Sequence, residues 1–114
     1  MKYNPTLLNV FNLNKFDPRE LTYSEKMLVE EYLGEILEEQ YSGDIQEIIH
    51  YQDKRITFSE DSEGFKLPLA NDLPLEYNLW NINSLFAYGE ADMELVAVLE
   101  NPENTMNQVM VSMY

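Results

Sequence analysis

The sequence contains no cysteine and only one histidine, His50, and these absences exclude several kinds of chemistry. Without thiols there is no disulfide, no iron–sulfur centre and no zinc–thiolate site. With a single histidine and no cysteine, the pattern supports no nucleophile–base triad. We therefore expect a protein that is not an enzyme and that uses no cofactor and no metal.

Glycine is also scarce, at four residues, and neither G-x-x-x-x-G-K-[ST] nor G-x-G-x-x-G occurs, so no phosphate-binding loop is indicated. The acids of the SEDSEG segment have the wrong spacing for a calcium loop. His50 beside Glu47 would be the one candidate general base. A lone histidine in a strand-like run is more simply a surface or half-buried side chain.

Long hydrophobic runs are absent as well. No stretch approaches the roughly 20 apolar residues of a membrane span. The N-terminal MKYNPTLLNVFNLNKF has an apolar patch interrupted by asparagines, without the apolar run and cleavage site of a signal peptide. We expect a cytoplasmic protein with no membrane partner.

Basic residues are few: seven Lys and Arg stand against 21 Asp and Glu, which gives a formal net charge of −14. Such a chain repels nucleic acid and anionic membranes and is attracted to basic surfaces. The expected partner is therefore a basic protein surface, such as that of a nucleic-acid-binding enzyme, with no direct contact to nucleic acid.

The 114 residues, 45% of them hydrophobic, predict one domain, 1–114, with enough apolar material for a core.

Asn4-Pro5 has the form of a short helix start, and Asp17-Pro18 repeats it. Thr22 and Glu25 have capping-box spacing ahead of a periodic segment. We predict a long helix at about 23–42, ending before Gly43. Its buried stripe is Val29, Leu33, Ile36 and Leu37, flanked by Tyr32.

Beyond Gly43 the apolar period changes to that of strands. A hairpin is predicted around Asp53-Lys54, with further strands at 65–70 and 75–80 and a final pair around the turn NPEN, where 91–100 has a helix as its alternative. The fold class is α+β, with N-terminal helices packed on an antiparallel sheet of about four to six strands.

The acidic residues are unevenly distributed. Residues 1–19 have a net charge of +2, residues 20–66 of −9, and residues 67–114 of −7 without any Lys or Arg. The window from Met27 to Asp53 holds eight acids and no base. Like-charge neighbours on the predicted helix cost it roughly 1 kcal/mol, and Gly34 costs about another 1 kcal/mol relative to alanine. A cationic partner that docks on these acids would remove the repulsion.

We predict a partner-binding surface on the acids of the helix and the segments after it, with one aromatic anchor. The candidate residues are Glu31, Glu35, Glu38, Glu39, Asp44, Glu47, Asp61, Glu63 and Trp80. The alternatives are a solvated helix face for the acids and core packing for Trp80.

No sequence motif identifies a family. In size, charge and lack of cysteine the chain is similar to small phage or mobile-element inhibitors that imitate DNA, including anti-restriction proteins, anti-CRISPR proteins and uracil-DNA glycosylase inhibitors. That resemblance implies an inhibitor that occupies the basic DNA site of a host enzyme, as a monomer or homodimer, and it assigns no residue.

Two alternatives stay open. One is an immunity protein or antitoxin for a basic toxin, which would use the same electrostatics on a different partner. The other is a phage structural or assembly protein, whose apolar tail VMVSMY would pair with a strand of another subunit.

Overall fold

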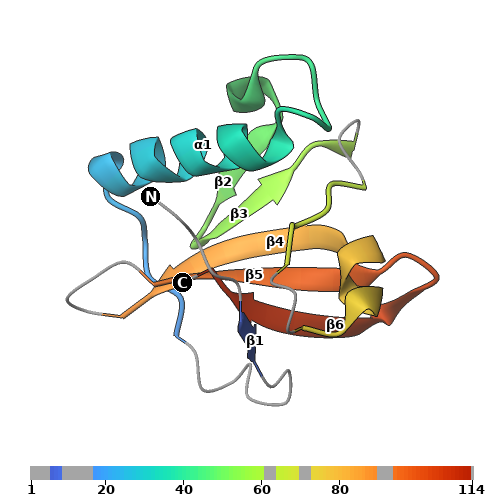
Figure 1. The fold of residues 1–114 in the computed structure, drawn as a ribbon. Coiled ribbons are helices and arrows are strands. Elements are labelled where there is room, and N and C mark those ends of the chain that lie inside the picture. Colours follow the sequence, from blue (N-terminus) through green and yellow to red (C-terminus); the bar gives the residue numbers. More distant parts are fainter. Residues whose placement is uncertain (1–5, 9–16, 61–63, 70–72, 90–93, 114) are drawn as a thin grey trace.

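The computed structural model describes residues 6–8, 17–60, 64–69, 73–89 and 94–113, with only the backbone given for 6–8. In these residues one α-helix packs on a six-stranded antiparallel sheet (Figure 1). The α+β prediction is confirmed. The elements are β1 (Thr6–Leu8), α1 (Tyr23–Leu37), η2 (Ile45–Glu47), β2 (Ile49–Gln52), β3 (Arg55–Phe58), η4 (Leu75–Leu79), β4 (Asn81–Tyr88), β5 (Glu94–Asn101) and β6 (Asn104–Ser112), where η marks a 3-10 helix.

The strand order is β1-β6-β5-β4-β3-β2, so β1 lies beside β6 although the two are far apart in the sequence. β1 pairs with β6 from Thr6↔Ser112 to Leu8↔Met110. The expectation that helices precede all the strands is wrong, because residues 6–8 form a strand ahead of α1. Asn4-Pro5, where a short helix was predicted to start, lies outside the described residues. The chain gains more by completing the sheet than by forming a short isolated helix, which is marginal in water.

The helix and one face of the sheet form the main core. Val29, Leu33 and Leu37 of α1 are fully buried together with Ile56, Leu85 and Val111 of the sheet, among other residues. The hydroxyl of Tyr32 lies 3.9 Å from the sulfur of Met113, which joins the helix to the end of the chain that follows β6. The predicted stripe is confirmed, with Ile36 half-buried at its margin.

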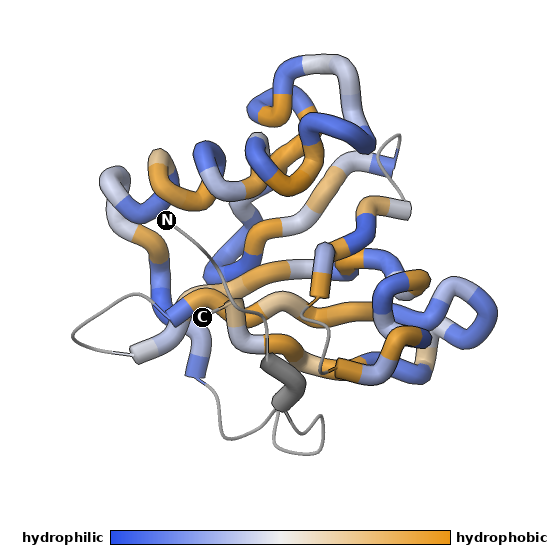
Figure 2. Tube along the Cα trace, viewed as in Figure 1, coloured by the Kyte–Doolittle hydropathy of each residue, from blue (hydrophilic) through white to orange (hydrophobic). Residues whose placement is uncertain are grey.

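The other face of the sheet is buried at its centre as well. Phe86, Val96, Val98 and Met110 form a second cluster there. Because β5 is buried on both faces, all five residues from Leu95 to Leu99 are buried, and the strand is a continuous apolar run without alternation. Figure 2 shows hydrophobic residues along the central strands and hydrophilic ones at the turn between β5 and β6. The strand prediction for 91–100 is confirmed over Glu94–Asn101, and its helical alternative is excluded there.

The predicted hairpins are also present. β2 and β3 pair around Asp53-Lys54, where Asp53 has φ +56°. Asn101↔Asn104 closes the NPEN turn between β5 and β6. Aspartate tolerates the left-handed region better than most residues, so the local chemistry of the turn was sufficient to find it.

The helix ends at Leu37, five residues before the predicted end. The Glu38 N–H donates to the Gly34 carbonyl, and the chain then turns away. Gln40 is the reason, because its side-chain amide exchanges two hydrogen bonds, of 2.8 and 2.9 Å, with the backbone of Lys66. Gly43 follows this turn instead of capping the helix. A Cβ there would lie 2.7 Å from the Tyr41 hydroxyl oxygen.

Two predicted strands are wrong. Residues 75–79 form η4, where the Tyr77 N–H donates to the Pro74 carbonyl and the Trp80 N–H to the Tyr77 carbonyl. The helical turn lets Tyr77 and Trp80 meet edge to face, with ring centroids 4.7 Å apart. Of the described residues 65–69, only Lys66 bridges β4, at Asn81, because Pro68 lacks the N–H that a ladder requires.

Candidate functional site

The outer face of α1 is the surface on which most of the predicted residues meet. Thr22 caps the helix: the Glu25 N–H donates to its hydroxyl oxygen and its own N–H donates to the Glu25 carboxylate, at 3.3 and 2.9 Å. The buried stripe then fixes the rotation of the helix about its axis. Positions three and four residues apart on the opposite side are left facing solvent.

Glu31 and Glu35 are exposed on this outer face, and Glu38 is the exposed C-cap residue. Glu39 is exposed in the turn that follows. Asp44 and Glu47 are exposed on η2, which lies beside α1 (Figure 1). We call the six carboxylates of Glu31, Glu35, Glu38, Glu39, Asp44 and Glu47 the acidic face. The structure therefore brings six of the nine predicted residues to one helix and the segment that adjoins it.

Glu30 holds η2 against α1, and Asp44 caps η2. The Asp44 carboxylate accepts a hydrogen bond of 3.0 Å from the Gln46 N–H and so caps η2. The Gln46 side-chain amide donates to the Glu30 carboxylate at 3.2 Å, and the Tyr51 hydroxyl donates to the other oxygen of that carboxylate at 3.2 Å. Glu30 is therefore a structural acid, although its neighbour Glu31 points to solvent. Burial and then the Glu30 carboxylate raise the pKa of the Tyr51 hydroxyl far above its usual value of 10.

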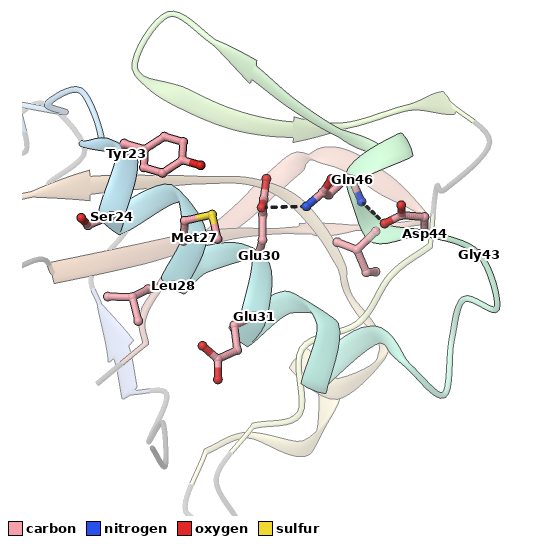
Figure 3. Close-up of a pocket in the computed structure, with 10 residues that line it drawn as sticks. Tyr23, Ser24, Met27, Leu28, Glu30, Glu31, Gly43, Asp44 and Gln46 are labelled. Atoms are coloured by element: carbon pink, nitrogen blue, oxygen red, sulfur yellow. Dashed lines mark hydrogen bonds between the residues drawn. The ribbon is translucent and has the colours of Figure 1, made fainter.

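A groove of about 750 Å³ lies between the first half of α1 and η2 (Figure 3). Its apolar lining includes Tyr23, Met27 and Leu28, which are 79%, 51% and 43% exposed. Glu31 and Asp44 also line it. Sequence reasoning missed these three apolar residues. The signal was present for Met27, which falls on the helix side opposite the buried stripe, whereas Leu28 falls on the flank of that stripe.

Three cations of the described segments contact groups away from the acidic face. Arg19 forms a two-pronged pair with Glu25, at 2.8 and 2.6 Å. The Lys26 ammonium lies 5.0 Å from the Tyr51 ring centroid, and the Arg55 guanidinium lies 5.3 Å from that of Phe86. None of these contacts reaches the acidic face, so its charge is not neutralised by them.

One predicted site residue does not join this surface, and two others lie outside the described residues. Trp80 is 6% exposed and packs in the main core, so it is corrected from an interface anchor to a core residue. Burial of the large hydrophobic ring in the core stabilises the fold of the free protein, whereas an exposed ring would contribute no such stabilisation until a partner bound. Asp61 and Glu63 lie outside the described residues.

In the described segments, no group of three or more His, Asp or Glu side chains is arranged to hold a metal ion. His50 is exposed on β2. Within the same segments, no helix has both the length and the apolar character needed to cross a bilayer.

Comparison with known proteins finds no matching family model, no matching curated sequence and no matching solved structure. The acidic face and the groove beside it are therefore the features of the molecule that point to a function.

Proposed function

We propose that the chain is a small acidic inhibitor that imitates DNA and blocks the basic nucleic-acid site of a host defence or DNA-processing enzyme in the cytoplasm. One observation supports this most directly. Of the eight acids between Met27 and Asp53, seven are exposed, and that window contains no Lys or Arg. The exception is Glu30, whose carboxylate accepts the internal hydrogen bonds from Gln46 and Tyr51.

The arrangement of the carboxylates along α1 suits a groove built for phosphates. With a rise of about 1.5 Å per residue, Glu31 and Glu35 are separated by about 6 Å along the axis, and Glu35 and Glu38 by about 4.5 Å. Phosphates advance by about 3.4 Å per strand along duplex DNA. The row of carboxylates therefore has a spacing of the same order as a phosphate backbone.

The energetics of the helix agree with selection for binding. Glu35 has like-charged neighbours at Glu31 and Glu38, and the last turn of α1 has no basic residue to balance the negative end of the helix dipole. A docked cationic surface removes both costs. Association should be fast at low salt because opposite net charges steer the encounter, and it should weaken steeply as salt rises.

The test is inhibition of DNA cleavage or base excision by a panel of purified enzymes, comprising restriction endonucleases, CRISPR effector nucleases and uracil-DNA glycosylase. An enzyme that responds is then assayed with the triple variant Glu31→Gln, Glu35→Gln, Glu38→Gln. We expect the inhibition constant to rise by at least about tenfold, because close charge pairs across interfaces are worth more than about 1.5 kcal/mol.

The matched control removes three exposed acids elsewhere, Glu76→Gln, Glu94→Gln and Glu103→Gln. It has the same net charge as the triple variant, so only the position of the lost charge differs. Equal inhibition by both variants would show that the acidic face has no special role. Inhibition by the protein should also fall as competing DNA is added, whereas an immunity protein that binds its toxin away from the DNA site would be insensitive to DNA.

One observation disfavours the assembly alternative. Met110 and Val111 of the apolar tail are already paired with β1 on one side and β5 on the other, and both side chains are buried. The tail therefore does not offer these residues as a free strand edge to another subunit.

A further inference from the structure

The groove between α1 and η2 differs from the rest of the acidic face because it is lined by apolar side chains. Tyr23, Met27 and Leu28 project into solvent along two successive turns of the helix (Figure 3). Single exposed apolar residues are ordinary on protein surfaces. Three exposed apolar side chains that line one groove, with carboxylates at its margin, are typical of a surface that contacts a partner.

The groove is formed before any partner binds. Glu30 ties η2 to α1 through Gln46 and ties α1 to β2 through Tyr51. The cap at Asp44 fixes the first turn of η2. Walls held by these hydrogen bonds lose little conformational entropy on association, so the apolar contact is not offset by a large ordering cost.

We propose that this groove seats a large apolar side chain of the partner protein, from a segment in which Lys or Arg residues flank that side chain. Met27 and Leu28 contact the apolar group, and Glu31 and Asp44 pair with the cations. Methionine suits this role because its flexible thioether adapts to the shape of what it contacts. The inference rests on the proposed function for the sign of the partner's charge, and it adds an apolar anchor to what would otherwise be electrostatic recognition alone.

The negative charge of Glu31 and Asp44 at the margin of the groove disfavours nucleic acid, anionic membranes and a second copy of this chain as its ligand. Nucleic acid and anionic membranes are repelled by a chain of net charge −14. A second copy of this chain, docked about a two-fold axis through the groove, would bring Glu31 and Asp44 of both copies together. Like charges juxtaposed across an interface cost several kcal/mol. A basic, apolar segment of a different protein meets neither obstacle.

The probes are two labelled peptides of about 15 residues, of the length of an amphipathic helix that docks in a groove. One is built of leucine and lysine and the other of serine and lysine, with lysines at the same positions. Binding is measured by fluorescence anisotropy. We expect the unmodified protein to bind the leucine peptide at least about tenfold more tightly, because burial of one leucine supplies that factor.

The variant Met27→Gln, Leu28→Gln should reduce this preference to about twofold or less and leave the affinity for the serine peptide unchanged. Glutamine has nearly the same helix propensity as leucine and methionine, so α1 is preserved. The matched control is Leu75→Gln, Leu79→Gln, a pair of exposed leucines on η4, which should keep the full preference.

Several outcomes would overturn the inference: a leucine preference that survives Met27→Gln, Leu28→Gln, equal loss of preference in the η4 control, or no leucine preference at all. A dimer in sedimentation that Leu28→Gln dissociates would also overturn it, since the occupant would then be a second copy. The proposed function fails separately, when the triple variant Glu31→Gln, Glu35→Gln, Glu38→Gln inhibits the target enzyme as strongly as the control variant Glu76→Gln, Glu94→Gln, Glu103→Gln does.

Discussion

At the scale of single residues, Arg19 and Glu25 connect the start of the helix to the sheet. The Arg19 N–H donates to the Ala87 carbonyl and its Nε donates to the Gly89 carbonyl, while its two terminal nitrogens reach Glu25. The Arg19 side chain, and to a smaller extent the hydrogen bonds of Thr22, lower the pKa of Glu25 to about 2. One carboxylate therefore completes the capping box and fixes α1 beside the end of β4.

The first prediction concerns this carboxylate. Glu25→Gln should lower the free energy of unfolding by about 1–2 kcal/mol at pH 7, since it weakens a charge-assisted pair. Folding lowers the pKa of Glu25 from 4.5 to about 2, so its stabilisation is complete above about pH 4.5 and is lost as pH falls toward 2. Urea denaturation of both proteins from about pH 7 downward measures the difference.

The control for this prediction is Glu20→Gln, an exposed glutamate that precedes the cap. It should change stability by less than about 0.5 kcal/mol at any of these pH values. A gap between the Glu25 variant and the unmodified protein that stays constant down to pH 3 would contradict the assigned role.

At the scale of elements, α1 combines good capping and a well-buried stripe with an outer face that is poorly chosen for stability. Gly34, in mid-helix, and the row of glutamates both weaken it. The helix persists because Val29, Leu33 and Leu37 are fully buried against the sheet. Burial of the inner side of α1 therefore offsets the destabilising residues on its outer face, and those outer residues remain exposed to a partner.

The second prediction is that Gly34→Ala stabilises the protein by about 1 kcal/mol. A Cβ at this position meets no atom within 4 Å, so the gain in helix propensity is not offset by a clash. Thermal denaturation followed by circular dichroism gives the change. A decrease in melting temperature would mean that the glycine has a packing role that its surroundings do not reveal.

The third prediction is that Glu35→Gln stabilises α1 by about 0.5 kcal/mol, because it removes the repulsion from Glu31 and Glu38. The same change should weaken inhibition of the target enzyme. Urea denaturation measures the change in stability, and the inhibition assay measures the change in binding. A gain in stability together with weaker inhibition would show that Glu35 serves binding and does not stabilise the fold. Loss of stability together with loss of binding would contradict this interpretation.

At the scale of the whole molecule, charge and size act together. The described part of the chain extends over 35 × 34 × 26 Å. At about 0.01 M salt the Debye length is about 30 Å, so nearly all charges interact; at about 0.15 M it is about 8 Å, and only neighbours do. Among the described residues the ion pair between Arg19 and Glu25 offsets this repulsion directly.

The fourth prediction is that the melting temperature rises by a few degrees as sodium chloride increases from about 0.01 to about 0.15 M, since screening removes self-repulsion from a net charge of −14. The triple variant Glu31→Gln, Glu35→Gln, Glu38→Gln should show a smaller rise. A melting temperature that falls with salt would mean that attractive pairs outweigh repulsion.

Local chemistry was enough to predict several elements. Thr22 and Glu25 form the predicted capping box, Asp53 lies in the predicted turn, and the apolar run in β5 is a buried strand. Each of these signals depends on residues close in sequence. The end of α1 was missed because Gln40 bonds to Lys66, which is 26 residues away. The turn at 75–79 brings the Tyr77 ring against Trp80, which is buried in the core, and no local pattern contains that contact.

The candidate surface was predictable in part for the same reason. Helix periodicity places Glu31 and Glu35 opposite the buried stripe, so their exposure follows from sequence. The contribution of Asp44 depends on Gln46 reaching Glu30, a contact across the groove that no local pattern contains. The groove itself exists only when η2 packs beside α1.

By itself the sequence determined the class of the fold, the buried side of the helix and the concentration of negative charge between Met27 and Asp53, because periodicity and composition are properties of the chain. Only the tertiary structure decided that Trp80 is core, that Glu30 is bonded while Glu31 is exposed, and that Met27 and Leu28 line a groove. The physical reason is that burial and hydrogen bonding of these side chains are settled by partners distant in sequence, whose positions depend on the packing of the whole sheet.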